Sequence, residues 1–250
     1  MSKKLEGKVA VVTGGSTGIG LATAQEFVNE GATVYITGRR QNQLDEAVKL
    51  IGGNVKAVRS DVSNLGDLDS LYETIAQDGH KIDVLFANAG GGELAPLGSI
   101  TEEQFDKMFD INVKGLLFSV QKALPIFNDG GSIILNASVA SIKGMPAFSV
   151  YSATKAAVRS FARSWANDLK DRKIRVNSIS PGPIDTPIIE GITGSKEGAD
   201  QFKEQVTTMV PLGRVGEPVE IGRAAVFLAS GDSSYVNGVE LFVDGGLGQV

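Results

Sequence analysis

The chain has 250 residues, of which 42% are hydrophobic and 21% are charged, and its formal net charge at pH 7 is −5. This composition provides enough apolar material for a globular core, and the negative charge argues against a nucleic-acid partner. The absence of cysteine excludes disulfides and cysteine chemistry. The single histidine, His80, lies in a polar turn and is expected at the surface, so we expect no metal site.

The sequence also gives no sign of a membrane partner. No apolar run approaches the ~18 residues that a membrane-spanning helix needs. The first eight residues lack the apolar core of a signal peptide. We therefore expect no membrane association and a cytoplasmic location.

Strand-like and helix-like patterns alternate along the chain. Short apolar runs predict strands at residues 9–13, 33–37, 55–58, 82–87, 132–136, 174–179 and 239–243. Apolar residues at helical spacing predict helices at 19–29, 41–50, 65–76, 101–124, 151–169 and 219–229. Near-continuous apolar strands that alternate with helices predict an α/β fold, with one parallel sheet covered on both faces. Without a linker or repeat, residues 1–250 are predicted to form a single domain.

Residues 183–211 interrupt this alternation. They contain proline, glycine and a polar run, with only a short helical pattern at 199–208. A loop of this length in a compact domain is more often functional than structural. We predict a substrate-side lid, with an ordinary surface excursion as the alternative.

A glycine-rich turn follows the first predicted strand and opens the first helix, with the spacing Gly14-x-x-x-Gly18-x-Gly20. Glycines let the backbone approach a pyrophosphate closely, and a helix N-terminus favours the anion. In this strand–turn–helix context the pattern predicts dinucleotide binding. The candidate residues are Gly14, Ser16, Thr17, Gly18, Ile19 and Gly20.

The end of the second predicted strand bears on the choice of cofactor. An NAD-selective site would place a carboxylate here for the ribose hydroxyls, but Gly38 offers none. Arg39 could meet a 2′-phosphate, and Arg40 is beside it, so the sequence favours NADP(H), with NAD(H) as the alternative cofactor. The two arginines could instead be solvated charges at a helix entry.

Two further strand ends supply candidate cofactor contacts. Asp61 and Val62 follow the third strand, where a side chain could reach an adenine ring; an N-cap role is the alternative. Asn88, Ala89 and Gly90 follow the fourth strand, at the carboxyl edge where ligands bind in parallel sheets.

Tyr151 and Lys155 are four residues apart on a predicted helix, so they share one face. An ammonium beside a phenol favours the phenolate and lowers the pKa of the tyrosine. A tyrosine tuned in this way can act as a general acid or base near neutral pH. Ser138, at the end of the fifth predicted strand, is a candidate partner.

Together these motifs resemble the short-chain dehydrogenase/reductase family over essentially the whole chain. The resemblance rests on Thr13-Gly14-x-x-x-Gly18-x-Gly20, Asn88-Ala89-Gly90, Asn112, Ser138, Tyr151-x-x-x-Lys155 and Pro181-Gly182-Pro183-Ile184-x-Thr186. It implies a Rossmann-type, doubly wound fold with a seven-stranded sheet, and a homotetrameric assembly. The chain departs from the common pattern at Ala87, where asparagine is frequent, and in the glycine-rich residues 90–93, which could widen the substrate pocket.

The resemblance also implies roles for single residues. Tyr151 would be the catalytic acid/base, and Ser138 would hold the substrate oxygen. Lys155 would bind the nicotinamide ribose and lower the pKa of Tyr151, while Asn112 would organise a water of the proton relay. The segment 181–186 would enclose the nicotinamide, through Pro181, Gly182, Ile184 and Thr186.

The apolar residues near these motifs indicate the substrate. Candidate pocket walls are Val139, Met145, Phe148, Ile184, Ile188 and Ile189. They favour a small to medium apolar ketone, or its alcohol, although core packing would explain them equally well. The predicted function is that of an NADP(H)-dependent carbonyl reductase or alcohol dehydrogenase.

Three other functions are weighed against this prediction. A 3-oxoacyl-thioester reductase would need a basic surface for an acyl carrier. Such a surface could be formed by Arg159, Arg163, Lys170, Arg172 and Lys173, or these charges could simply be the solvated side of their helix. A non-catalytic dinucleotide sensor would not need Ser138, Asn112, Tyr151 and Lys155. A sugar-nucleotide epimerase is disfavoured by the chain length and the glycine spacing.

Overall fold

The computed structural model describes residues 3–250 and contains one seven-stranded sheet in the order β3-β2-β1-β4-β5-β6-β7. Every neighbouring pair of strands is parallel. The strands are β1 (Val9–Val12), β2 (Thr33–Gly38), β3 (Val55–Arg59), β4 (Ile82–Ala87), β5 (Phe127–Asn136), β6 (Arg175–Pro181) and β7 (Glu240–Val243). The doubly wound α/β fold predicted from the sequence is confirmed.

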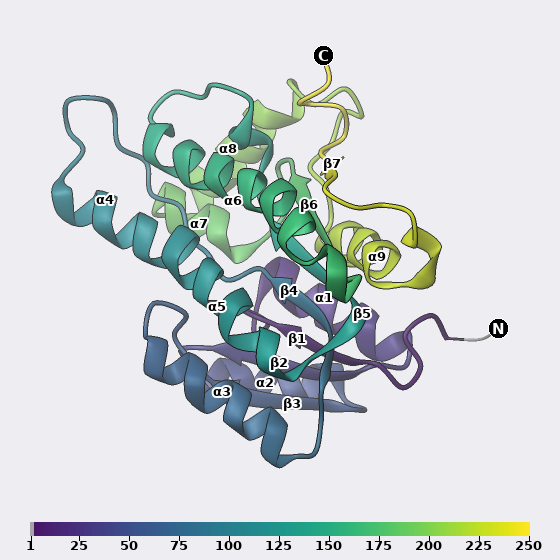
Figure 1. Cartoon of the computed structure of the whole chain (residues 1–250). Coiled ribbons are helices and arrows are strands. Elements are labelled where there is room, and N and C mark those ends of the chain that lie inside the picture. Colours follow the sequence, from purple (N-terminus) through teal and green to yellow (C-terminus); the bar gives the residue numbers. More distant parts are fainter. Residues whose placement is uncertain (1–2) are drawn as a thin grey trace.

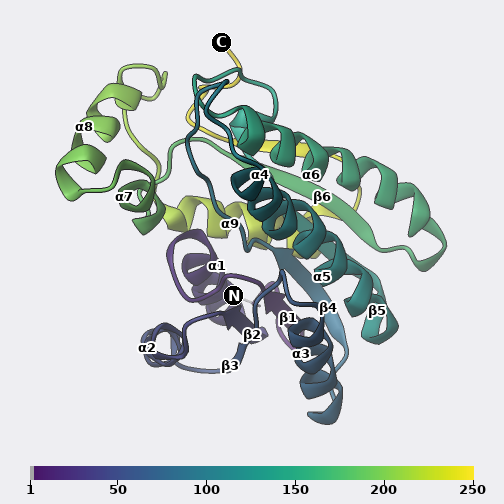
Figure 2. The same ribbon diagram turned by 90° about the vertical axis from the view of Figure 1, so that its left-hand side faces the viewer.

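Helices cover both faces of this sheet (Figures 1 and 2). One layer holds α1 (Gly18–Asn29), α2 (Gln41–Ile51) and α9 (Pro218–Ala229). The other holds α3 (Leu65–Gln77), α4 (Glu102–Phe109), α5 (Leu116–Ala123) and α6 (Ser149–Asp168).

The alternation of side chains along the strands divides the core into two halves. Val9 and Val11 of β1 pack with the helices α3, α5 and α6, whereas Ala10 and Val12 pack with α1, α2 and α9. Successive strand residues point to opposite faces of a sheet. A strand that is apolar at every position is therefore buried on both sides, as an inner parallel strand must be.

The fifth strand differs from the prediction. It begins at Phe127, five residues before the predicted start at residue 132. The added stretch is polar and rich in glycine, so its sequence has no strand pattern. A residue from another segment of the chain holds it in place: Arg172 donates hydrogen bonds to the carbonyl of Phe127 and, at 2.8 Å, to the carboxylate of Asp129.

The predicted lid region contains two helices, where the sequence indicated one short helix. These are α7 (Pro187–Thr193) and α8 (Lys196–Thr207), which stand apart from the helix layers at the upper left of Figure 2. Pro187 occupies the first turn of α7, where its missing N–H costs nothing. Gly194 ends α7 with φ +79°, and the Ser195 side chain caps α8 by accepting from the N–H of Gly198.

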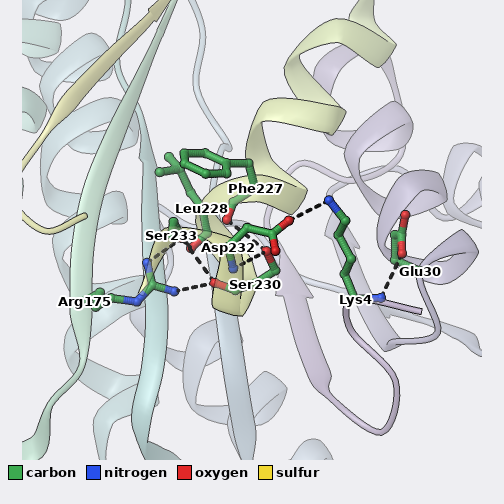
Figure 3. Close-up of polar contacts among 8 residues, drawn as sticks. All are labelled: Lys4, Glu30, Arg175, Phe227, Leu228, Ser230, Asp232 and Ser233. Atoms are coloured by element: carbon green, nitrogen blue, oxygen red, sulfur yellow. Dashed lines mark hydrogen bonds and ion pairs between the residues drawn. The ribbon is translucent and has the colours of Figure 1, made fainter. Parts of the chain in front are cut away.

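A polar cluster at the start of β6 connects segments that are distant in the sequence (Figure 3). Arg175 of β6 donates to Ser233 Oγ at 2.9 Å and to the carbonyl of Ser230 at 3.2 Å, just past the end of α9. Lys4 pairs with Asp232 at 2.6 Å, and its N–H donates to the Glu30 carboxylate at 2.9 Å. The N-terminal segment, α9 and β6 are thereby fixed to one another.

Candidate active site

A cleft of about 540 Å³ runs along the carboxyl edge of the sheet. Residues from strand ends and from α6, α7 and α8 face it. All the site residues predicted from the sequence line it: Gly14, Ser16, Thr17, Gly18, Ile19, Gly20, Arg39, Arg40, Asp61, Val62, Asn88, Ala89, Gly90, Asn112, Ser138, Val139, Met145, Phe148, Tyr151, Lys155, Pro181, Gly182, Ile184, Thr186, Ile188 and Ile189.

The glycine-rich turn needs its glycines. Gly14 and Gly18 have φ of +64° and +54°, in the left-handed region that favours glycine. A Cβ at Gly20 would lie 2.1 Å from the carbonyl oxygen of Gly14, so the turn could not close there. Thr17, at the N-cap of α1, makes no side-chain capping bond. Its neighbouring N–H groups can therefore serve an anion at this end of the cleft.

The end of β4 is fastened to this turn. Thr13 Oγ1 accepts hydrogen bonds from the N–H groups of Asn88 and Ala89, at 2.9 and 3.0 Å. The Asn88 amide in turn donates to the carbonyls of Thr13 and Gly14, at 3.0 and 3.2 Å. The two predicted cofactor motifs therefore form one hydrogen-bonded unit.

Asn136 extends this unit to the lysine of α6, a part that the sequence prediction missed. Its Nδ2 donates to Asn88 Oδ1 at 2.8 Å, and its backbone carbonyl accepts from Lys155 Nζ at 2.7 Å. Its own Oδ1 is buried and has no hydrogen-bond partner among residues 3–250. The sequence signal that could have pointed to Asn136 was its position as a single polar residue at the end of an apolar strand.

Tyr151, Ser138 and Lys155 converge in the middle of the cleft. Lys155 Nζ lies 5.7 Å from the centre of the Tyr151 ring. Burial lowers the pKa of Lys155 to about 8. Burial also raises the pKa of the Tyr151 phenol, and the neighbouring Ser138 hydroxyl opposes that shift only in part.

The net shift of the Tyr151 pKa in the free protein is thus upward, opposite to the lowering expected from the sequence. Two physical reasons account for this. The phenol is desolvated, which favours its neutral form. The lysine is desolvated as well and directs its ammonium to the carbonyl of Asn136.

Asn112 lies in a π-helical turn, Asp110–Gly115, which interrupts the helix predicted at 101–124. Its Oδ1 accepts from the N–H of Gly91 at 3.0 Å, and its Nδ2 donates to the carbonyl of Gly91 at 2.9 Å and to Thr154 Oγ1 at 3.1 Å. Such turns are frequent at functional sites. Here the turn points the buried side-chain amide of Asn112 toward the loop that follows β4.

At the other end of the cleft, Arg39 and Arg40 are exposed and have no ion-pair partner in the described part of the chain. Asp61 is not the N-cap of α3, because the Asn64 side chain accepts from the N–H of Gly66 at 2.9 Å and fills that position. Asp61 instead accepts from the Ser63 hydroxyl at 2.7 Å.

The substrate end has more apolar walls than the sequence indicated. Val139, Ile184 and Ile189 line the cleft but are buried, so they serve the core as well. Ile192, Phe202, Val206, Met209 and Leu247 join them and were not predicted. They come from α7, α8, the turn after α8 and the chain near the C-terminus. Only the tertiary fold brings those segments over the cleft.

Within residues 3–250 no group of three or more potential ligand side chains could hold a metal ion. No helix in the same range is long and apolar enough to cross a membrane.

Comparisons with known proteins agree with this architecture. A family model described as enoyl-(acyl carrier protein) reductase matches residues 14–248. The oxidoreductase asL5 of Sarocladium schorii is 48% identical over 99% of this chain and 98% of its own length. The NADP-dependent (R)-specific alcohol dehydrogenase of Lentilactobacillus kefiri is 37% identical over 98% of both chains. A short-chain dehydrogenase/reductase variant from Serratia marcescens has a TM-score of 0.89 at 29% identity, covering 98% of this chain and 99% of that one.

The fold and the cleft are those of a dinucleotide-dependent oxidoreductase. The chain belongs to the short-chain dehydrogenase/reductase family, and it is an NAD(P)-dependent enzyme of that family.

Proposed function

We propose that this enzyme reduces small to medium apolar ketones with NADPH and catalyses the reverse oxidation of the alcohols. One observation carries the proposal: a single cleft joins a glycine-rich turn with Arg39 at one end to Tyr151, Ser138 and apolar walls at the other.

A nicotinamide dinucleotide fits the residues of the first end. Gly20 allows the tight turn to close, because a Cβ there would lie 2.1 Å from the Gly14 carbonyl oxygen, and the start of α1 has N–H donors for a pyrophosphate. In this proposal Asp61 and Val62 contact the adenine. Asn88, Ala89 and Gly90 face the nicotinamide half from β4, and the segment 181–186 faces it from β6. The bound cofactor supplies the hydride.

The arginines support NADP(H) over NAD(H) in this proposal. Gly38 offers no carboxylate to a ribose, and a Cβ there would lie 3.0 Å from Ser16 Oγ. Arg39 and Arg40 are exposed, form no ion pair among residues 3–250 and can meet a 2′-phosphate. Arg39→Ala should raise the KM for NADPH roughly tenfold, the loss of one charge-assisted contact, and leave the KM for NADH unchanged. Consumption of NADH alone would contradict this preference and leave the fold assignment intact.

The catalytic residues act on the substrate oxygen. Ser138 and Tyr151 donate hydrogen bonds to the carbonyl oxygen, which gains negative charge in the transition state. Donors that are already in place stabilise that charge more than they stabilise the ketone. Because burial raises the pKa of Tyr151, the phenol is protonated at neutral pH and can give its proton to the oxygen. The Lys155 ammonium then stabilises the phenolate.

The experiment that tests this proposal follows the absorbance of NADPH with an aryl ketone, a β-keto ester, a β-ketoacyl thioester and a sugar. We expect consumption with the apolar ketones. Tyr151→Phe should fold and bind NADPH but lose turnover by about 10²–10⁴-fold, the usual contribution of a positioned acid. Near-normal turnover in this variant would refute the role of Tyr151. Tight NADPH binding with no turnover on any substrate would favour a non-catalytic sensor.

A second candidate function is the reduction of a 3-oxoacyl thioester. It is supported by the likeness to the 3-oxoacyl-[acyl-carrier-protein] reductase FabG of Thermotoga maritima, which is 39% identical over 98% of this chain and 99% of its own length. The proposed basic surface is smaller than the sequence indicated. Arg159 pairs with Glu240 at 3.5 Å, and Arg172 holds Asp129 and the start of β5. Arg163, Lys170 and Lys173 remain for an acyl carrier. A kcat/KM for an acyl-carrier thioester well above that for the same thioester of a small thiol would favour this function.

We also propose that the enzyme is a cytoplasmic homotetramer. Phe105 on α4 is 45% exposed, and β7 forms an edge of the sheet, so both offer surface for subunit contacts. Light scattering should give four times the 26.2 kDa chain mass. The mass of a single chain would contradict the assembly.

A further inference from the structure

The loop after β4 contains three consecutive glycines, and the structure separates their roles. Gly91 is held on both sides, because Asn112 accepts from its N–H at 3.0 Å and donates to its carbonyl at 2.9 Å. A Cβ at Gly91 would meet nothing within 4 Å. The backbone is thus fixed at Gly91, while its missing side chain leaves only open space.

Gly92 is half-buried and faces the catalytic tyrosine. A Cβ at this position would lie 3.5 Å from Cδ2 of the Tyr151 ring and 3.6 Å from Cδ1 of Ile192 in α7. These are ordinary van der Waals distances, so a methyl group would fill the space without a clash. A longer side chain would extend further into the gap between the tyrosine and the lid helix.

The backbone does not require glycine at position 92. Neither Gly91 nor Gly92 is among the residues with positive φ, so an L-amino acid can adopt both conformations. Because Asn112 is hydrogen-bonded to both the N–H and the carbonyl of Gly91, the loop is restrained from moving back to accommodate a larger side chain at position 92. The consequence of glycine at position 92 is therefore space beside Tyr151.

The walls around this space are apolar. The Phe148 ring lies edge-on to the Tyr151 ring, with centroids 5.6 Å apart and an interplanar angle of 78°. Ile188, Ile192 and Phe202 line the same cleft from the lid helices. Aromatic rings pack well in surroundings of this kind.

We propose that Gly92 is a specificity-determining residue, which keeps room between Tyr151 and Ile192 for a ring attached directly to the carbonyl carbon of the substrate. This inference rests on the proposed ketone reduction and names its substrate class as aryl ketones, including those with fused rings.

The test compares kcat/KM for 2-butanone, acetophenone and 2-acetylnaphthalene in the wild-type enzyme, Gly92→Ala, Gly92→Leu and Gly91→Leu. For Gly92→Leu, the ratio of the naphthyl ketone to 2-butanone should fall at least about tenfold, the scale of a pocket group's effect on discrimination. Gly92→Ala should give an intermediate ratio. Gly91→Leu is the matched control and should keep the wild-type ratio.

The outcomes separate the inference from the proposed function. An equal loss on all three ketones in Gly92→Leu, or the same change of ratio in Gly91→Leu, overturns the role of Gly92. If the wild type reduces no ketone, the proposed function fails. The role of Gly92 is then tested by calorimetry, which measures the affinities of the NADP⁺-loaded proteins for 1-phenylethanol and 1-(2-naphthyl)ethanol. A selective loss of naphthyl affinity in Gly92→Leu would support the inference, and equal affinities would overturn it. The thermal midpoint and NADPH binding of each variant establish that it is folded.

Discussion

Burial, and not the charge of a neighbour, sets the protonation of the two central residues of the cleft. Desolvation raises the pKa of the Tyr151 phenol and lowers that of Lys155 to about 8. At neutral pH this leaves a protonated phenol beside a lysine that still carries its charge. Both states suit a site that donates a proton to a ketone oxygen.

The first prediction concerns the pH dependence of ketone reduction. Lys155 is charged below its pKa of about 8 and neutral above it. The kcat/KM for NADPH, which reports the free enzyme, should therefore fall as pH rises through about 8. Tyr151, with its raised pKa, stays protonated over this range and does not cause the fall.

Lys155→Arg provides the control for this profile, because a guanidinium keeps its charge at high pH. It should be less active at every pH and should lack the descending limb near pH 8. The same limb in this variant would assign it to another group.

The second prediction concerns Asn136, a positioning residue that connects Asn88 to Lys155. Asn136→Ala removes the donor to Asn88 Oδ1 and leaves that oxygen without its partner. Such a loss costs about 1–3 kcal/mol. We expect a lower denaturation midpoint and a higher KM for NADPH, with a smaller change in the KM for the ketone. Equal changes in both KM values would indicate a general structural defect.

Among the elements, the π-helical turn Asp110–Gly115 connects the two ends of the cleft. Asn112 reaches the loop after β4, while Gly115 packs against Val62, which follows β3. A Cβ at Gly115 would lie 2.9 Å from both Cγ2 and the carbonyl oxygen of Val62. The close approach of this turn to the end of β3 therefore depends on glycine.

The third prediction is that Gly115→Ala displaces the turn. Overpacking of this kind costs about 1–3 kcal/mol, and we expect the KM for NADPH to rise as Val62 and Asn112 move. Gly66→Ala in the first turn of α3 is the control, since its Cβ would come no nearer than 3.4 Å to Asn64 Oδ1. Unfolding in urea and steady-state kinetics measure both effects. Wild-type values for Gly115→Ala would show that the turn tolerates a side chain.

At the scale of the whole molecule, the Arg175 cluster of Figure 3 joins the start of β6 to the segment that follows α9. This guanidinium joins β6 to the end of α9, and burial lowers its pKa. A group that is half withdrawn from water needs its partners, because a lost hydrogen bond is not replaced fully by solvent.

The fourth prediction is that Arg175→Ala destabilises the fold by about 1–3 kcal/mol without changing the KM for either substrate, because the cluster lies away from the cleft. Arg163→Ala is the control: Arg163 is exposed, and no ion pair to it occurs among residues 3–250. It should stay within about 0.5 kcal/mol of the wild type. Equal urea midpoints for the two variants would show that the Arg175 cluster does not stabilise the fold.

The sequence by itself determined the class of the fold and the family of the enzyme. Apolar runs such as that of β1 must be buried on both faces, and a parallel sheet with helices on each side accomplishes this. The short motifs sit at strand ends, and parallel strands bring their carboxyl ends to one edge. For this reason all the predicted site residues line one cleft.

Only the tertiary structure decided the rest. Leu247 lies far from Ile192 and Phe202 in the sequence, and α7, α8 and the C-terminal segment bring the three residues to the same cleft. The hydrogen bonds that join Asn88, Asn136 and Lys155, and the space that Gly92 leaves beside Tyr151, depend on contacts between separate elements. The pKa of Tyr151 depends on burial, a property of the packed molecule that a spacing of four residues does not reveal.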